Sequence, residues 1–204
     1  MPKIVDHEQR RAELAEAAWR LAARDGLEAV TVRRVAAEAG LSTGAVVHYF
    51  RDKDDLILFA FETIVDRVGR RWALAAAQAT DPLELARLQV IEGLPLDADR
   101  RAEFRVWFAF LGLAMTRPEF ARAQRVAYRA WRRRLTLTFR EAQEQGRIDP
   151  ELDCEREAAA LIALVDGLAV QASFEPRTFT GERLLELVDD RLNAMRPGPE
   201  AATR

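Results

Sequence analysis

Two short helix-like stretches separated by a single glycine constrain the fold of this chain most. They lie in TVRRVAAEAGLSTGAVVHYFRDKDDL, residues 31–56, and Gly40 separates them. Thr31 and Ser42 are residue types that cap helix N-termini, and glycine readily adopts the positive φ that a tight turn requires. Leu41 is an apolar residue that can pack behind such a turn. The segment therefore predicts two short helices that cross at about a right angle, a helix-turn-helix.

Helix-favouring residues dominate the rest of the chain as well. Ala, Leu, Arg and Glu are abundant, whereas glycine and proline number only 10 and 8. No run of alternating β-branched residues indicates a strand. We expect an all-α fold of about nine helices. It would comprise a three-helix, helix-turn-helix domain over residues 1–52, a helical bundle over 53–196 and a disordered tail over 197–204.

Charge and cysteine content exclude several classes of protein. The formal net charge of the 204 residues is -2, so a surface coated throughout by nucleic acid is excluded. Cys154 is the single cysteine, which excludes an internal disulfide and offers no zinc-ligand spacing. The charged start MPKIVDHEQRR resembles no signal peptide, and no uncharged apolar run spans a bilayer. We expect a cytoplasmic protein with no metal, no cofactor and no membrane partner.

The second helix of the pair has the residues that entry into a DNA major groove demands. That groove is about 12 Å wide, so an entering helix should be slim at its start and polar where it meets phosphates or base edges. Phe50 follows the helix and is expected to lie in the core. The residues that fit the exposed side are Ser42, Thr43, Gly44, Ala45, His48 and Tyr49.

Residues 8–60 resemble the TetR-type bacterial transcription regulators. Members carry a helix like TVRRVAAEAG, a turn and helix like LSTGAVVHYF, and an acidic and basic linker like RDKDDLILFAF. Residues 157–176, EAAALIALVDGLAVQASFEP, resemble the dimerising helix of the BetI-like branch. The resemblance implies a sequence-specific DNA-binding regulator and favours repression, with activation as the alternative. Many members have an aromatic residue where this chain has Val47, so one contact to the DNA backbone is expected to be missing.

The resemblance also implies roles for individual residues. Base edges would be read by Thr43, Gly44, Val47 and His48. Phosphates would be held by Thr31, Arg33, Arg34, Tyr49 and Lys53, with Ser42 and Ala45 completing the surface. Arg33 and Arg34 could instead form a solvated face, and His48 could be an ordinary surface histidine.

A single helix-turn-helix reads too few base pairs, so we expect a homodimer on a palindromic operator. The dimer would form through the last two long helices, at about residues 153–173 and 180–195. Their predicted interface residues are Leu161, Val165, Leu168, Leu184, Leu187 and Val188.

The C-terminal half is longer than dimerisation requires and is rich in aromatic residues. We expect it to bind an unknown small-molecule effector, apolar or cationic, that lowers operator affinity. The candidate pocket residues are Trp107, Phe110, Met115, Tyr128, Trp131, Phe139 and Asp166. The alternative for the aromatic residues is ordinary core. A carboxylate in so apolar a run needs a partner. For Asp166 the resemblance favours a contact between helices or between subunits over ligand binding.

Two rival functions remain as alternatives. An enzyme is disfavoured because the chain has no GxSxG, HExxH or P-loop motif and only two histidines. A helical interaction module would bind DNA weakly and without steep salt dependence. The basic run at residues 121–134 is interpreted as a solvated or salt-bridged helix face rather than a second DNA site.

Overall fold

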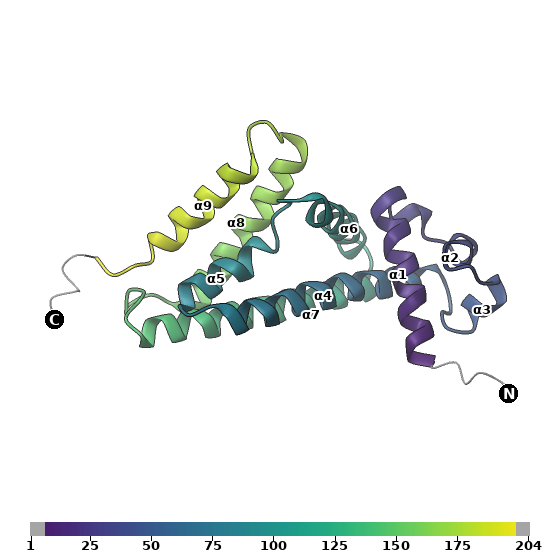
Figure 1. Cartoon of the computed structure of the whole chain (residues 1–204), viewed down its shortest axis with the longest axis horizontal. Helices are drawn as coiled ribbons and strands as arrows, with labels where there is room; N and C mark the ends of the chain where they lie inside the picture. Colours follow the sequence, from purple (N-terminus) through teal and green to yellow (C-terminus); the bar gives the residue numbers. More distant parts are fainter. Residues whose placement is uncertain (1–6, 199–204) are drawn as a thin grey trace. The chain divides into compact units, whose positions relative to one another are not determined.

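The computed structural model describes residues 7–198, and all regular structure in that range is helical (Figure 1). The elements are α1 (His7–Asp25), the short 3-10 helix η1 (Leu27–Ala29), α2 (Val32–Ala39), α3 (Thr43–Val47), α4 (Lys53–Gln78), α5 (Pro82–Ile91), α6 (Ala98–Ala114), α7 (Pro118–Glu144), α8 (Cys154–Phe174) and α9 (Gly181–Asn193). The prediction of an all-α fold with nine α-helices is confirmed for this range. Most of the predicted disordered tail, residues 199–204, lies outside the described residues.

The chain forms two compact units, each built from two segments. The first comprises Met1–Arg67 and Arg105–Gln124, and the second comprises Val68–Phe104 and Arg125–Arg204. The sequence predicted a single domain boundary after residue 52. The first unit instead extends to residue 67 and also includes residues 105–124. The long helices α4, α6 and α7 each contribute residues to both units.

The interior of the first unit holds the helix-turn-helix in place. Helix α1 packs against α2, and α2 packs against α3. Leu14 of α1, Val35 of α2 and Val46 of α3 are fully buried, and Phe50, which follows α3, is only 1% exposed. Burial of each large apolar side chain contributes about 1.5–3 kcal/mol. The position of α3 is therefore fixed from beneath, and the expectation that Phe50 is a core residue is confirmed.

Aromatic stacking explains why parts of α6 and α7 belong to the first unit. The rings of Phe61 and Phe110 are nearly parallel, with centroids 3.8 Å apart. Phe120 of α7 meets Phe110 edge to face at 5.2 Å. Both phenylalanines beyond α4 are fully buried. This contact between residues 61 and 110 has no local signal in the sequence, so a linear boundary could not include it.

Side-chain caps set the limits of the two helix-turn-helix helices. The Thr31 hydroxyl accepts from the backbone N–H of Arg34, and the Ser42 hydroxyl accepts from that of Ala45. Between them Gly40 has a φ of 67°, and its N–H donates back to α2. Only glycine adopts this conformation without strain, so the turn predicted from the sequence is the turn observed. Helix α3 is shorter than predicted, since it ends at Val47 rather than near Tyr49.

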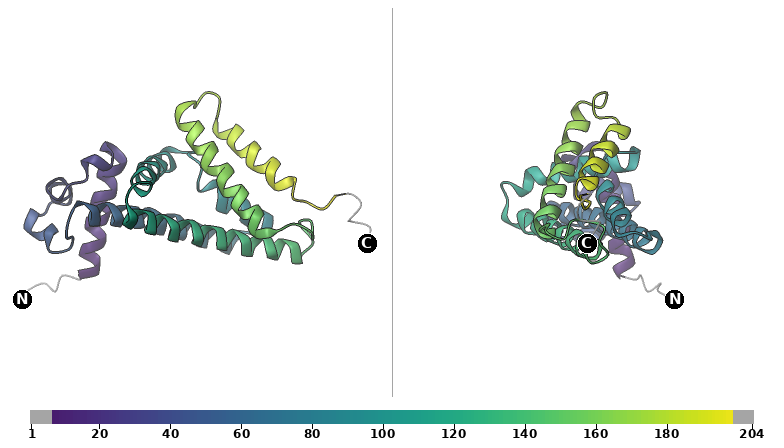
Figure 2. Two further views of the ribbon diagram at one scale, coloured as in Figure 1. Left: turned by 180° about the vertical axis from the view of Figure 1, so that it is seen from behind. Right: turned by 90° about the vertical axis from the view of Figure 1, so that its left-hand side faces the viewer.

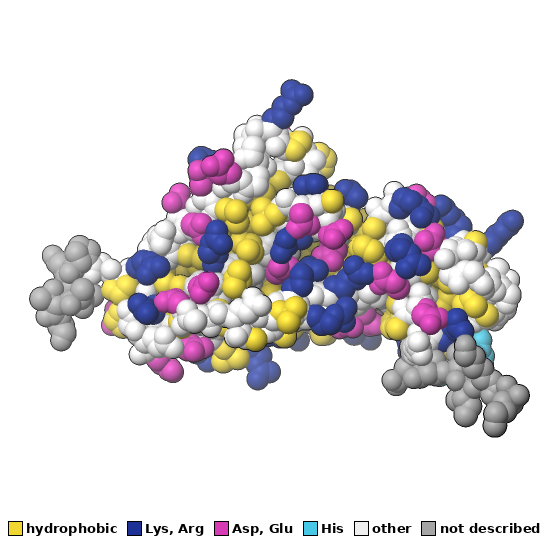
Figure 3. Space-filling model, viewed as in Figure 1, with side chains coloured by type: hydrophobic (Ala, Val, Ile, Leu, Met, Phe, Trp, Pro, Cys, Tyr) yellow, Lys and Arg dark blue, Asp and Glu magenta, His cyan; other side chains and the backbone are white. Residues whose placement is uncertain are grey.

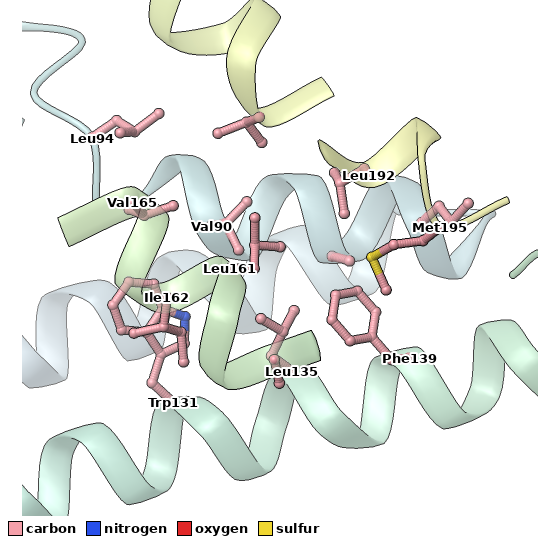
Figure 4. Close-up of a cluster of buried hydrophobic side chains, with 14 of the residues drawn as sticks. Val90, Leu94, Trp131, Leu135, Phe139, Leu161, Ile162, Val165, Leu192 and Met195 are labelled. Carbon is pink, nitrogen blue, oxygen red and sulfur yellow. The ribbon is translucent and has the colours of Figure 1, made fainter. Parts of the chain in front are cut away.

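The second unit has one continuous hydrophobic core formed by α5, α7, α8 and α9 (Figure 4). Leu135 and Phe139 of α7 lie opposite Leu161 of α8, and all three are fully buried. Helix α8 is the one described helix long and apolar enough to cross a membrane, with 39% of its most apolar window buried inside the chain. Core helices pass the same test, and α8 supplies eight of its residues to the interior. Its hydrophobicity is accounted for by the core.

Candidate nucleic-acid interface and effector site

Helix α3 presents a small, open and largely polar surface. Thr43, Gly44 and His48 are exposed, and the side chain of Val47 is 53% exposed. Val46 points the other way into the core. About half of the Val47 side chain is thus open to solvent. The predicted base-reading residues therefore share one accessible face.

The surroundings of Gly44 show that the fold does not require a glycine there. A Cβ atom at this position would have Ser42 Oγ, at 3.9 Å, as its nearest neighbour. Glycine within a helix costs about 1 kcal/mol relative to alanine. A glycine at this position is what a close approach of the helix backbone to DNA would require.

The residues of α2 have different structural duties. The Thr31 hydroxyl is engaged as the α2 cap, and the Arg34 guanidinium forms an ion pair with Asp25 at the end of α1. Arg33 is exposed, and no ion pair within the described residues engages it. Arg33 is thus the more available of the two arginines for a phosphate, whereas Arg34 ties α2 to α1.

Tyr49 and Lys53 lie beside the recognition surface and have partners that DNA could displace. The ring of Tyr49 lies 4.5 Å from that of His7 and 5.4 Å from that of His48. The Lys53 ammonium is 3.2 Å from the carboxylate of Glu28, which is 94% exposed. Exposed pairs of this kind contribute at most about 1 kcal/mol, so Lys53 can exchange its carboxylate for a phosphate. The sequence patterns did not single out His7, because only the folded chain brings it to this surface.

Basic and acidic side chains are interspersed over the face shown in Figure 3. This distribution agrees with the net charge of -2. Attraction to DNA must therefore be local, from residues such as Arg33 and Lys53, and the polar face of α3 must supply the discrimination between sequences.

The predicted effector-pocket residues are divided between the two units. Trp107, Phe110 and Met115 belong to the first, where Phe110 is fully buried in the aromatic stack and Met115 is 81% exposed. The other four belong to the second unit, where Phe139 lies in the close-packed core. Phe110 and Phe139 are therefore core residues, the alternative left open by the sequence.

Among the predicted effector-pocket residues, three lie close together: Tyr128, Trp131 and Asp166. The Tyr128 hydroxyl donates to a carboxylate oxygen of Asp166 at 2.6 Å. Trp131, one turn along α7 from Tyr128, packs against Ile162 and Val165 (Figure 4). Its indole N–H is buried and has no hydrogen-bond partner among the described residues.

Asp166 is a partly buried carboxylate with no cationic partner among the described residues. No Lys or Arg of the described chain forms an ion pair with it, and Tyr128 is its hydrogen-bond partner. Burial raises the pKa of Asp166 above its ordinary value, and the hydrogen bond from Tyr128 opposes that rise. An uncompensated carboxylate beside aromatic rings is an arrangement that attracts a small organic cation.

The structure places the predicted dimer residues inside the single chain. Leu161, Val165, Leu168, Leu184 and Val188 are between 0 and 4% exposed and belong to the core of the second unit, and Leu187 packs against the same core. The five buried side chains are therefore not accessible to a second chain, whereas Leu187 is only partly buried. Apolar periodicity identifies the buried side of a helix but does not tell which chain buries it.

The opposite face of α8 is exposed and lined by small residues. Ala160, Ala163 and Gly167 follow one another at helical spacing, and Phe174 at the end of the helix is 74% exposed. A Cβ atom at Gly167 would meet nothing within 4 Å. The spacing of these residues is visible in the sequence, but their exposure could be recognised only from the fold.

A capped helix-turn-helix with an open recognition face, in a chain with a larger helical unit, defines a DNA-binding protein of the helix-turn-helix class. The family model described as bacterial regulatory proteins of the tetR family matches residues 14–59. The model described as the C-terminal part of BetI-type transcriptional repressors matches residues 82–197. The chain belongs to the TetR family of transcriptional regulators, with a BetI-type C-terminal domain. The family predicted from the sequence is confirmed.

Individual relatives agree along almost the whole length. The chain is 34% identical to the transcriptional regulator PksA of Bacillus subtilis over 188 residues, covering 92% of this chain and 90% of that protein. It is 30% identical to BetI 1 of Chromohalobacter salexigens over 191 residues, covering 93% and 92% of the two chains. These relatives are transcriptional regulators, which are not enzymes, so the relationship confirms the prediction of a non-enzymatic regulator.

Solved structures extend the same relationship. A transcriptional regulator from Rhodococcus sp. Rha1 superimposes with a TM-score of 0.78 at 34% identity, covering 91% of this chain and 95% of that one. A regulator from Saccharomonospora viridis, solved in complex with choline, gives a TM-score of 0.83 at 27% identity, covering 91% and 96%.

Proposed function

We propose that two copies of this chain act in the cytoplasm as a repressor that binds a palindromic operator and releases it when a small cation binds the C-terminal domain. The observation that carries this proposal is the accessible face of α3, which Val46 and Phe50 fix to the core from below. A rigid, slim and polar helix face is what sequence reading in the major groove requires.

Base reading and phosphate binding are assigned to different residues. Thr43, Gly44, Val47 and His48 share the face of α3 that would enter the groove. Phosphates would be held at the rim by Arg33, which forms no ion pair with the described residues, by Tyr49 and by Lys53 after it leaves Glu28. Contacts to phosphates position a protein on DNA, and contacts to base edges specify the sequence.

The second copy is proposed to pack on the exposed face of α8. Its small residues Ala160, Ala163 and Gly167 allow two helix backbones to approach closely. Helix α9 lies beside α8 in the second unit (Figures 1 and 2), so the two pairs of helices would form a four-helix interface. A two-fold dimer would present its two recognition helices to half-sites about 34 Å apart.

The effector is proposed to be a small organic cation that pairs with Asp166. The support is the partly buried carboxylate without a cationic partner among the described residues, with Tyr128 and Trp131 supplying aromatic surface. The regulator from Saccharomonospora viridis was solved with choline, which is a cation of this kind. The ligand must prefer the conformation that does not bind DNA, and a tenfold loss of operator affinity needs about 1.4 kcal/mol of coupling.

The test compares choline with its uncharged isostere 3,3-dimethylbutan-1-ol in an operator-release assay. Choline should release the wild-type protein from labelled operator, and the neutral isostere should not, because it has the shape without the charge. Asp166→Asn should raise the choline concentration required by about tenfold or more. Because burial raises the pKa of Asp166, choline affinity should increase as the pH rises through that pKa and ionises the carboxyl group.

Glu144→Gln, at an exposed position of α7, is the matched control and should leave choline release unchanged. Equal responses to choline and to the neutral isostere would contradict the cation assignment. Operator binding itself would still be measured in the same assay, so the DNA-binding part of the proposal is judged separately.

A further inference from the structure

A groove on α7 of the second unit is not used by the proposed function. Its volume is about 370 Å³. The lining residues are Arg129, Arg132, Arg133, Thr136, Leu137 and Arg140 of α7 and Glu155 of α8. Helix α8 begins near the end of α7 (Figure 2), and its first turn contributes Glu155 to the lining.

The four arginines of this groove are unpaired within the described residues. None forms an ion pair with a described carboxylate, whereas Arg71, Arg87 and Arg191 of the same unit are each paired. Of the two alternatives given for residues 121–134, a solvated or a salt-bridged face, Arg129, Arg132 and Arg133 therefore agree with the solvated one. Their charge is left uncompensated.

This arrangement costs stability in two ways. Like charges one turn apart on a helix repel each other. In addition, the Nε–H of Arg132 is buried and has no hydrogen-bond partner among the described residues. A buried donor without an acceptor is unfavourable, and an unseen anion or water is an ordinary explanation for one.

The spacing of the guanidinium groups indicates the kind of anion. Successive helical turns place the layers about 5.4 Å apart, and Arg129 and Arg140 are separated by about 16 Å along the axis. Guanidinium groups bind phosphate oxygens in a bidentate manner. We propose that this groove binds a small, elongated anion that carries several phosphate groups, and that it is a second ligand site distinct from the Asp166 region.

The size of the groove favours a small molecule over a nucleic acid. A volume of 370 Å³ is within the range of sites for small ligands and cofactors, about 300–1,000 Å³. Glu155 opposes an anion at one end, so the strongest attraction lies along the α7 side. This inference does not depend on the identity of the operator or on the cation proposed as effector.

The experiment measures binding of inorganic tripolyphosphate to the full chain by isothermal titration calorimetry at low ionic strength. We expect saturable binding of one tripolyphosphate per chain that weakens steeply with added salt. The double variant Arg129→Ala with Arg133→Ala should lower the affinity by about tenfold or more, because it removes two charged donors. Alanine is a strong helix former, so α7 should remain folded, which circular dichroism would verify.

Two further variants provide opposite controls. Arg177→Ala removes an exposed arginine of the same unit outside the groove and should leave the affinity within about twofold of wild type. Glu155→Gln should raise the affinity, because it removes the one opposing charge of the groove. A general effect of net charge would instead give Arg177→Ala about half the loss of the double variant.

The proposal is overturned by any of three results. The first is no saturable binding of tripolyphosphate by the wild-type protein. The second is that the wild-type protein does not bind tripolyphosphate but the double variant loses affinity for random duplex DNA. That result would assign the groove to nucleic acid. The third is that the wild-type protein does not bind tripolyphosphate but the double variant changes its oligomeric state. That result would assign the groove to contact with a second copy of the chain.

Discussion

Substitution of Gly44 should affect protein stability and operator affinity in opposite directions. The space around its Cα is open, so Gly44→Ala should stabilise the protein by up to about 1 kcal/mol through helix propensity. The same methyl group would stand between α3 and the groove floor, so operator affinity should fall by about tenfold or more, equivalent to ~1.4 kcal/mol. Thermal melting and fluorescence anisotropy measure the two effects.

The control is Gly112→Ala on α6, where a Cβ atom also meets nothing within 4 Å. It should raise the melting temperature without reducing operator affinity. If Gly44→Ala bound the operator as tightly as wild type, the close approach of α3 to DNA would be wrong.

Replacement of Lys53 and replacement of Thr43 should change DNA affinity in different ways. Lys53→Ala removes a phosphate contact, so affinity should fall alike on all sequences and the salt dependence should flatten by about one unit. Thr43→Ala and His48→Ala should cost about 1–3 kcal/mol on the operator and little on random DNA. Titrations on both duplexes over a range of salt concentrations distinguish these outcomes, and equal losses for all three variants would contradict the assignment.

Single residues were predicted well where a local rule decides their role. Thr31, Gly40 and Ser42 have the cap and turn roles that their side chains dictate. Arg34 was predicted as a DNA contact or as part of a solvated face, and in the structure it pairs with Asp25, nine residues away. Partnerships of that range depend on how α1 and α2 pack, which no local pattern encodes.

At the scale of elements, α8 has two faces with different predicted roles. Ala163→Arg on the exposed face should convert the dimer to a monomer at micromolar concentration without unfolding it, because a long charged side chain would separate the two helices. Leu161→Ala on the buried face should instead lower the free energy of unfolding by about 2–5 kcal/mol. Sedimentation velocity and thermal melting measure these effects.

Ala76→Arg, at an exposed position of α4, is the matched control and should remain dimeric. If the Ala163→Arg protein remained dimeric, the subunit interface would not lie on the exposed face of α8.

The helices themselves were largely predictable, since caps and breakers mark their ends. Asp81 with Pro82, Asp153 and Thr180 cap α5, α8 and α9 respectively. The 3-10 turn η1 was not predicted, because its three residues are too few for any periodicity. Five of the predicted dimer residues are buried in the core of the same chain. On α8 the reason is that its inner face is apolar, whereas its outer face carries small residues.

At the scale of the whole molecule, the family and the class of fold could be predicted from residues 8–60 alone. The effector site could not, because aromatic residues of a core and of a pocket have the same helical spacing. Phe139 and Trp131 lie two turns apart on α7, and both are buried. The features that set the proposed effector region apart from plain core are the Asp166 carboxylate, which has no cationic partner among the described residues, and the Trp131 indole N–H, which has no hydrogen-bond acceptor there.

The central claim is that α3 of a dimer reads a specific DNA sequence, and selection of bound duplexes from a random DNA library tests it most directly. The account predicts enrichment of an inverted repeat whose half-site centres lie about one or two helical turns apart, about 34 Å or its multiple. An enriched pool that shares no sequence motif, or a motif with a single unrepeated half-site, would contradict it.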